Sequence, residues 1–123
     1  RALPALIKAQ RIQEKAANAG FDWEERAQVW DKVKEEISEV DAEAIAGNSE
    51  ALESEFGDLF FSLVNAARLY GITPENALEK TNKKFIRRFS HIETETAEAG
   101  KKLNELTLAE MDKLWNEAKK LEK

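Results

Sequence analysis

The sequence of 123 residues contains no cysteine, which excludes both a disulfide framework and a metal site built on thiolates. It has only two prolines and five glycines, so long stretches are free to form helices without interruption. No apolar run approaches the roughly 18 residues of a membrane span, and the N-terminus shows no signal-peptide pattern. We therefore expect a helix-rich protein that does not associate with membranes and is cytoplasmic.

Positive charge is also scarce, because 24 acidic residues outnumber 19 basic ones and leave a net charge of −5. A general nucleic-acid binder normally presents a basic surface, so we expect no nucleic-acid partner. One local basic cluster would still suffice for the phosphates of a nucleotide. The length suits a single domain over residues 1–123. Because the chain begins with Arg1 rather than Met, we expect it to be trimmed or cut from a longer protein.

Apolar residues recur at helical spacing along most of the chain, and no stretch alternates for long as a strand would. Four residues are in positions to cap helix N-termini: Asp22, Ser49, Thr73 and Thr107. Glycines 20, 47 and 71 lie where helices are expected to end. The sequence therefore predicts an all-α fold, a four- to five-helix bundle, with helices over about residues 3–19, 23–46, 49–70, 74–97 and 107–121.

Apolar stripes on these helices predict the core. In the second helix the stripe comprises Val29, Trp30, Val33, Ile37, Val40 and Ala44. In the third helix it comprises Leu52, Phe56, Leu59, Phe60, Leu63 and Ala66.

Two pairs of carboxylates flank these stripes, Glu36 with Glu39 and Glu55 with Asp58. If the two helices fold back about Gly47, Glu39 and Glu55 each lie eight residues from the turn, and Glu36 and Asp58 each lie eleven. All four side chains then meet at one level. Four carboxylates held together repel one another strongly unless a cation lies among them. Oxygen ligands favour a hard divalent ion, so we predict Mg²⁺, with Mn²⁺ as a substitute.

The fourth predicted helix has a basic face that includes Lys84, Arg87 and Arg88. Such a face is usually only a solvated surface. Trp115 lies at helical spacing with other apolar residues, which suits core packing as well as stacking on a ligand. His91, the only histidine, lies off the core face, and we expect no catalytic or ligand role for it. A di-iron carboxylate bundle is excluded, because it needs two Glu-x-x-His motifs and Arg88 stands three residues before His91.

Three segments together resemble the signature of MazG-type nucleoside triphosphate pyrophosphohydrolases. They are Glu35-Glu36-x-x-Glu39, Glu55-x-x-Asp58 and Asn82-Lys-Lys-Phe-Ile-Arg-Arg-Phe89. The connector Gly20-Phe-Asp-Trp23 and the terminal Leu114-Trp115 are most similar to the C-terminal domain of a MazG protein. The resemblance covers nearly the whole chain.

This resemblance implies an all-α bundle that assembles as a dimer or a pair of dimers. It implies Mg²⁺-dependent hydrolysis of the bond between the α- and β-phosphates of a nucleoside triphosphate, giving the monophosphate and pyrophosphate. The metal ligands that it implies are Glu36, Glu39, Glu55 and Asp58. The substrate contacts that it implies are Lys32, Glu35, Lys84, Arg87, Arg88 and Trp115.

On this hypothesis Glu35 or Glu39 accepts the proton of the attacking water. Lys32 either reaches a phosphate or pairs with Glu36. The three basic residues of the fourth helix hold the outer phosphates, and Trp115 stacks on the base, a contact that tolerates any base. Two alternatives stay open. One is a dUTPase- or dCTPase-like specificity, and the other is a catalytically weak domain that senses nucleotide.

Overall fold

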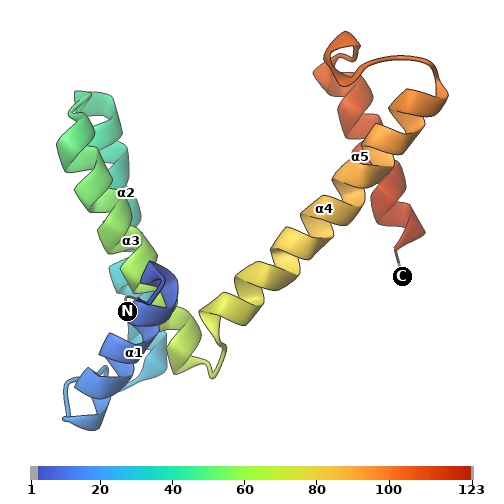
Figure 1. The fold of residues 1–123 in the computed structure, drawn as a ribbon. Helices are drawn as coiled ribbons and strands as arrows, with labels where there is room; N and C mark the ends of the chain where they lie inside the picture. The colour runs from blue at the N-terminus through green and yellow to red at the C-terminus, as the bar shows by residue number, and fades with distance from the viewer. Residues whose placement is uncertain (1–2, 123) are drawn as a thin grey trace. The chain divides into compact units, whose positions relative to one another are not determined.

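The structure is a computed structural model that describes residues 3–122, and within that range it contains five α-helices, two short 3₁₀ turns and no strand (Figure 1). The elements are α1 (Ala5–Asn18), η1 (Arg26–Gln28), α2 (Val29–Ala46), α3 (Ser49–Leu69), α4 (Pro74–Glu98), η2 (Leu103–Glu105) and α5 (Leu108–Leu121). The prediction of an all-α fold is confirmed. The chain divides into two compact units, of which the first ends at Ala77 and the second begins at Leu78. The prediction of one domain stays a prediction.

Helices α2 and α3 form an antiparallel hairpin in the first unit (Figure 1). Gly47 ends α2 at a φ of 78°, a left-handed conformation that glycine adopts at little steric cost. Asn48 then caps α3, because its side-chain oxygen accepts a hydrogen bond from the Ala51 N–H at 3.1 Å. The predicted cap, Ser49, is wrong by one position, since Ser49 is already the first helical residue.

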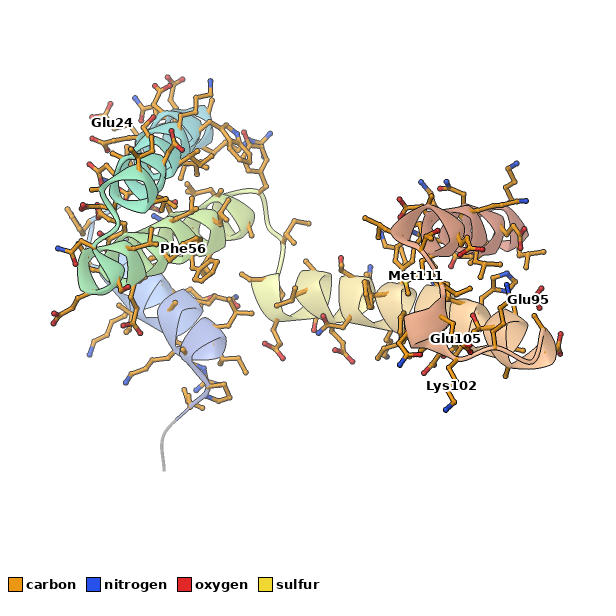
Figure 2. All side chains as sticks on the ribbon, turned by 90° about the horizontal axis from the view of Figure 1, so that it is seen from above. Glu24, Phe56, Glu95, Lys102, Glu105 and Met111 are labelled. Atoms are coloured by element: carbon orange, nitrogen blue, oxygen red, sulfur yellow. The ribbon has the colours of Figure 1, made fainter. Side chains whose placement is uncertain are left out.

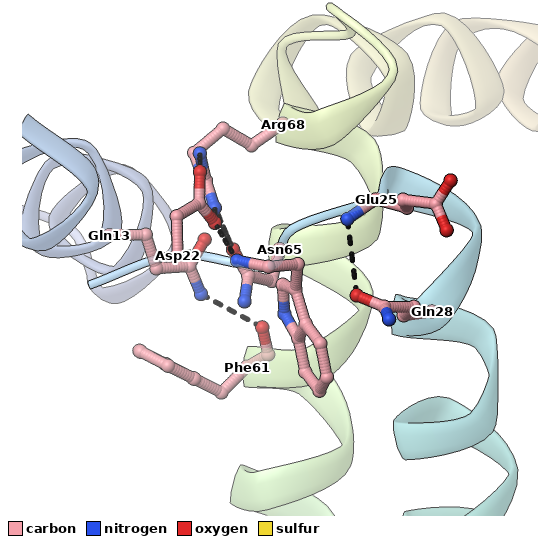
Figure 3. Close-up of polar contacts among 8 residues, drawn as sticks. Gln13, Asp22, Glu25, Gln28, Phe61, Asn65 and Arg68 are labelled. Carbon is pink, nitrogen blue, oxygen red and sulfur yellow. Dashed lines mark hydrogen bonds and ion pairs between the residues drawn. The ribbon is translucent and has the colours of Figure 1, made fainter. Parts of the chain in front are cut away.

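The start of the second helix was also predicted too early, because α2 begins at Val29 rather than at Trp23. Asp22 does not cap it. The Asp22 carboxylate instead accepts hydrogen bonds from Arg68 of α3 at 2.7 and 3.2 Å (Figure 3). It also accepts one from the Trp23 N–H at 2.9 Å. A charge-assisted contact with a distant helix therefore overrides the local capping preference. The turn η1 occupies part of the segment between Trp23 and Val29 that was predicted to be helical. Within this segment the Glu25 N–H donates a hydrogen bond to Gln28 Oε1 at 3.1 Å (Figure 3).

In the second unit, α5 begins at the predicted capping box. Thr107 Oγ1 accepts a hydrogen bond from the Glu110 N–H at 3.1 Å, and Glu110 Oε1 accepts one from the Thr107 N–H at 2.8 Å. Hydrogen bonds to the ionised carboxylate hold the pKa of Glu110 below its usual value. The sequence prediction of this cap is confirmed.

The core of the first unit is smaller than the stripes predicted. Val29, Val33 and Ala66 are buried, with Trp23, Leu59 and Leu69 packed against them. A stripe about 100° wide is broader than the surface that one neighbouring helix covers, so its edges stay exposed. Figure 2 labels one of these residues, Phe56 on α3, which is 40% exposed. The other predicted core residues of α2 and α3 that the structure leaves exposed are Trp30, Ile37, Ala44, Phe60 and Leu63.

Across the described part of the chain, we find no helix with the length and apolar character needed to cross a bilayer.

Candidate functional site

Three carboxylates meet on the α2–α3 hairpin. Glu36, Glu39 and Glu55 each bring one oxygen to within 4.8 Å of the others. We call this group the carboxylate cluster. Asp58, the fourth predicted ligand, is exposed and lies outside this group. Its charge nevertheless contributes to raising the pKa of Glu55, so its side chain lies close by.

Glu36 is the most constrained member of the cluster. Its side chain is 3% exposed, and its Oε1 lies 3.2 Å from Lys32 Nζ. Its other oxygen, Oε2, is buried and has no hydrogen-bond partner among residues 3–122. A buried carboxylate oxygen without a partner is destabilising. A divalent cation among the three carboxylates would satisfy this oxygen, so the residues present fit the metal ion that the sequence predicts.

Repulsion and desolvation together raise the pKa values of the other two members. The charge on Glu36 is the main cause for Glu39, followed by desolvation and the charge on Glu35. Desolvation is the main cause for Glu55, and the charges on Glu39 and Asp58 add to it. Without a bound cation the cluster is therefore a source of strain at neutral pH.

This strain predicts how the stability of the metal-free protein depends on pH. A carboxyl group whose folded pKa is raised stabilises the fold below its unfolded pKa, about 4.3 for Glu, and that contribution is lost as the pH rises through the folded pKa. We expect the Glu39→Gln/Glu55→Gln variant to melt a few degrees above the unmodified chain at pH 7.5 in EDTA, with the difference vanishing near pH 4.

Thermal melts of both proteins between pH 4 and pH 7.5 test this expectation. Mg²⁺ should raise the melting temperature of the unmodified chain and leave the variant unchanged. A difference between the two proteins that does not change with pH would contradict the assignment of the strain to these two groups.

Lys32 lies next to the cluster. Its ammonium group donates a hydrogen bond to Glu35 Oε2 at 3.0 Å in addition to its contact with Glu36, and both contacts raise the pKa of Lys32. The predicted pairing with Glu36 is therefore present, while a contact with a phosphate stays a prediction. Lys32 and Glu35 also line an open depression of about 480 Å³ together with Trp23, Gln28 and Asp31. The depression therefore opens to solvent beside Lys32, which contacts Glu36.

In the second unit, the Arg88 guanidinium lies over the Trp115 ring, 5.2 Å from its centre. The centres of the Phe85 and Trp115 rings are also 5.2 Å apart. We call Lys84, Arg87, Arg88 and Trp115 the basic–aromatic cluster. Trp115 is half-buried, so it packs within the unit and still has an exposed part. Packing and stacking on a base are therefore compatible roles.

Arg88 is already engaged by a carboxylate. Its Nη2 lies 2.9 Å from Glu122 Oε1, and its Nε donates to the two oxygens of Glu122 at 3.2 and 3.3 Å. Arg87 Nε lies 3.8 Å from the same carboxylate. Hydrogen bonding to Arg88 is the main reason that the pKa of Glu122 lies below its usual value. A phosphate that binds Arg88 must therefore displace Glu122 or share the guanidinium with it.

We accordingly expect Glu122→Gln to tighten nucleotide binding by roughly threefold to tenfold, because a neutral amide competes less well than a carboxylate for Arg88. The measurement is the Kd of a non-hydrolysable triphosphate analogue. Asp112→Asn, which removes a charge from an exposed position on α5, the helix that Glu122 directly follows, serves as the matched control. Equal affinities for the two variants would show that Glu122 does not compete with the phosphates.

A further polar network holds the connector before α2 and was not predicted. Arg68 Nη2 donates to Asp22 Oδ1 at 2.7 Å and to Asn65 Oδ1 at 2.6 Å (Figure 3). Gln13 Nε2 donates to the Phe61 carbonyl at 2.9 Å and so joins α1 to α3 (Figure 3). Arg68 and Asp22 are 46 residues apart in sequence, and Gln13 and Phe61 are 48 apart, separations at which helical periodicity gives no signal. Because Trp23 lines the depression beside Lys32, the network fixes one wall of the candidate site.

Comparison with known proteins bears on the same residues. The family model of the MazG nucleotide pyrophosphohydrolase domain matches residues 24–93, more than half of the chain. The chain belongs to this family. The match spans the carboxylate cluster, Lys32 and the basic face of α4, whereas Trp115 lies beyond it. The MazG relationship is thus supported independently of the carboxylate geometry.

Individual relatives agree with the family assignment. The chain is 44% identical to the nucleoside triphosphate pyrophosphohydrolase of Escherichia coli K12, over 99% of this chain and 47% of that protein. It is 42% identical to the nucleoside triphosphate pyrophosphohydrolase/pyrophosphatase MazG of Thermotoga maritima, over 95% of this chain and 45% of that protein. It is 57% identical to the Bacillus subtilis protein YabN over 72 residues, 58% of this chain and 15% of that protein. The chain therefore spans about half the length of the first two relatives.

Proposed function

We propose that this chain hydrolyses nucleoside triphosphates, ribo and deoxy alike, to the monophosphate and pyrophosphate in a Mg²⁺-dependent reaction with broad base specificity. The observation that carries the proposal is the carboxylate cluster, which lies inside the range that the family model matches. Its buried Glu36 oxygen has no hydrogen-bond partner in the described part of the chain. The names of the E. coli and T. maritima relatives support the reaction class.

Glu36, Glu39, Glu55 and Asp58 would hold the ion, which is Mg²⁺ with Mn²⁺ as a substitute. When bound, it neutralises charge on the phosphate oxygens and activates water for attack on phosphorus. The protein's part is to keep Glu36 in place, through burial and its contact with Lys32.

Glu35 and Glu39 are the two candidates for the group that takes the proton from the attacking water. Glu35 stands outside the carboxylate cluster and is exposed, and Lys32 holds one of its oxygens. Because Glu35 is not one of the proposed metal ligands, it can accept a proton without breaking a bond to the ion. Glu39 belongs to the cluster, and its raised pKa makes it a better base before a cation binds. If Glu35 is the base, Glu35→Gln lowers kcat and leaves the affinity for Mg²⁺ unchanged.

We assign the outer phosphates to Lys84, Arg87 and Arg88 and the base to Trp115. The guanidinium of Arg88 offers paired N–H donors to phosphate oxygens. The half-buried Trp115 ring would stack on the base, and stacking tolerates any base because every base has a π-face. This contact is the physical reason for expecting broad specificity.

We also propose that the chain assembles as a homodimer or a higher homo-oligomer. The support is the set of large apolar side chains that stay exposed on the α2–α3 hairpin, including Ile37, Phe56 and Phe60. Exposed apolar side chains that lie together commonly mark an interface. A cytoplasmic location and the lack of a nucleic-acid partner stay predictions.

Turnover measured with each ribo- and deoxynucleoside triphosphate, with Mg²⁺ and with EDTA, tests the proposal. We expect all bases to be turned over at rates within about tenfold of one another, and only with the metal. A much larger preference for dUTP or dCTP would favour the dUTPase- or dCTPase-like alternative. Nucleotide binding without any turnover would favour the nucleotide-sensing alternative.

A further inference from the structure

The second unit contains another group of metal-ligand side chains, none of which has a role in the proposed reaction. His91 and Glu95 lie one turn apart on α4, and Glu117 lies on α5. One ligand atom from each residue lies within 4.8 Å of the others. Figure 2 labels Glu95 on the side of α4 that faces α5. The three side chains therefore converge between two helices of the same unit.

The distance between two of these atoms is compatible with a shared metal ion. His91 Nε2 lies 3.4 Å from Glu117 Oε1, and in the metal-free protein the two atoms form a long hydrogen bond. Two ligand atoms that each lie about 2.0–2.1 Å from a tetrahedral Zn²⁺ are about 3.4 Å apart. The observed separation matches that edge of the tetrahedron.

The chemistry of the three groups points to the same class of ion. Carboxylates alone would suit Mg²⁺, but an imidazole nitrogen with two carboxylates suits Zn²⁺. Among the described residues, neither Glu95 nor Glu117 forms an ion pair with a lysine or an arginine, so both carboxylates are available. The His91 side chain is 20% exposed and that of Glu117 is 45% exposed. This exposure leaves room for a water molecule as a fourth ligand.

The backbone that carries these ligands is well supported. Ile92 and Thr96 follow His91 and Glu95 directly on α4 and are buried, and Ala118 follows Glu117 on α5 and is also buried. Thr96 Oγ1 donates a hydrogen bond to the Ile92 carbonyl at 2.6 Å. Contacts between Phe85 and Trp115 and between Arg88 and Glu122 also join α4 to α5 and its C-terminal end, which reduces the reorganisation that metal binding requires.

We propose that His91, Glu95 and Glu117 form a Zn²⁺ site, with three protein ligands and one water, that joins α4 to α5. This reverses the expectation from the sequence that His91 has no ligand role. The site shares no residue with the carboxylate cluster or the basic–aromatic cluster, so it stands whether or not the proposed reaction is correct. Because a metal ion that binds the folded state stabilises it, Zn²⁺ also raises the melting temperature.

The single histidine makes a direct test available. In the ¹⁵N-labelled full chain, one imidazole signal reports on this site alone, even if Zn²⁺ also binds the carboxylate cluster. Zn²⁺ titrated at pH 7.5, where metal binding requires the neutral imidazole, is expected to shift the ring nitrogen resonance and to saturate at one ion. Mg²⁺ is expected to leave it unchanged.

Two double variants give the matched comparison. Glu95→Gln/Glu117→Gln removes two proposed ligands and is expected to weaken Zn²⁺ binding at His91 by at least about tenfold. Glu93→Gln/Asp112→Asn removes the same number of charges from exposed positions on the same two helices and should bind like the unmodified chain. Metal-free melts of both variants show that each one folds.

Two results would overturn the proposal. One is an imidazole resonance that does not shift at Zn²⁺ concentrations up to about 1 mM. The other is a loss of less than about tenfold in the Glu95→Gln/Glu117→Gln variant, which would mean that the histidine binds Zn²⁺ without the two carboxylates.

Discussion

Replacing Glu36 with glutamine is expected to lower Mg²⁺-dependent turnover of nucleoside triphosphates by about a thousandfold. Glu36 is the buried member of the carboxylate cluster, and its Oε2 has no partner within the described residues. Glutamine keeps the shape of the side chain, but it removes the negative charge and places an amide group beside the ion. The effect should appear in kcat and in the Mg²⁺ concentration that gives half-maximal rate.

A matched control separates this effect from a general loss of charge. Glu53→Gln makes the same substitution at an exposed position of α3 outside the cluster, and it should leave both parameters within about twofold of the unmodified chain. In EDTA the Glu36→Gln variant should melt no lower than the unmodified chain, because the substitution relieves repulsion among the carboxylates. If this variant keeps a tenth or more of the activity, Glu36 is not a ligand of the essential ion.

Replacing Arg68 with alanine is expected to lower the free energy of unfolding by about 2 kcal/mol. The Arg68 side chain is 13% exposed and donates hydrogen bonds to Asp22 and Asn65. Its removal leaves two acceptors without their shared donor and frees the connector that carries Trp23, which packs against the core. Because the Asp22 side chain is 28% exposed, water compensates for part of the loss.

Urea denaturation of the two proteins measures this difference, and a change in midpoint at constant slope identifies a change in stability. Arg68 lowers the pKa of Asp22 by hydrogen bonding. The contribution of the pair is therefore present above the unfolded pKa of about 3.9 and is lost as the pH falls through the lowered folded value. The variant and the unmodified chain should converge in acid. Arg11→Ala, at an exposed position of α1, should change the stability little.

The elements that depend on local signals could be predicted from the sequence. The cap at Thr107 and the turn at Gly47 occur where residue type and position indicated them. The turn and the helical period together also fixed which carboxylates lie at the same level. The structure places Glu36, Glu39 and Glu55 together, whereas Asp58, the fourth carboxylate expected at that level, lies outside their group. The role of each residue stays a prediction.

The features that depend on distant contacts could not be predicted. The pairing of Asp22 with Arg68 moved the start of α2 to Val29, and no spacing rule relates residues 46 positions apart. The exposure of Phe56 and Phe60 depends on how much of a stripe one neighbouring helix covers. The convergence of His91 with Glu117 depends on the packing of α5 against α4. Predicting each of these features requires knowledge of how the helices pack, which the residue pattern of one helix does not contain.

Following the reaction of ATP by ³¹P NMR, with Mg²⁺ and then with EDTA, tests directly whether the site cleaves the bond between the α- and β-phosphates. We expect equal amounts of AMP and pyrophosphate in the presence of Mg²⁺ and no products in EDTA. The appearance of ADP and orthophosphate would contradict the proposed reaction, because attack would then occur at the terminal phosphorus.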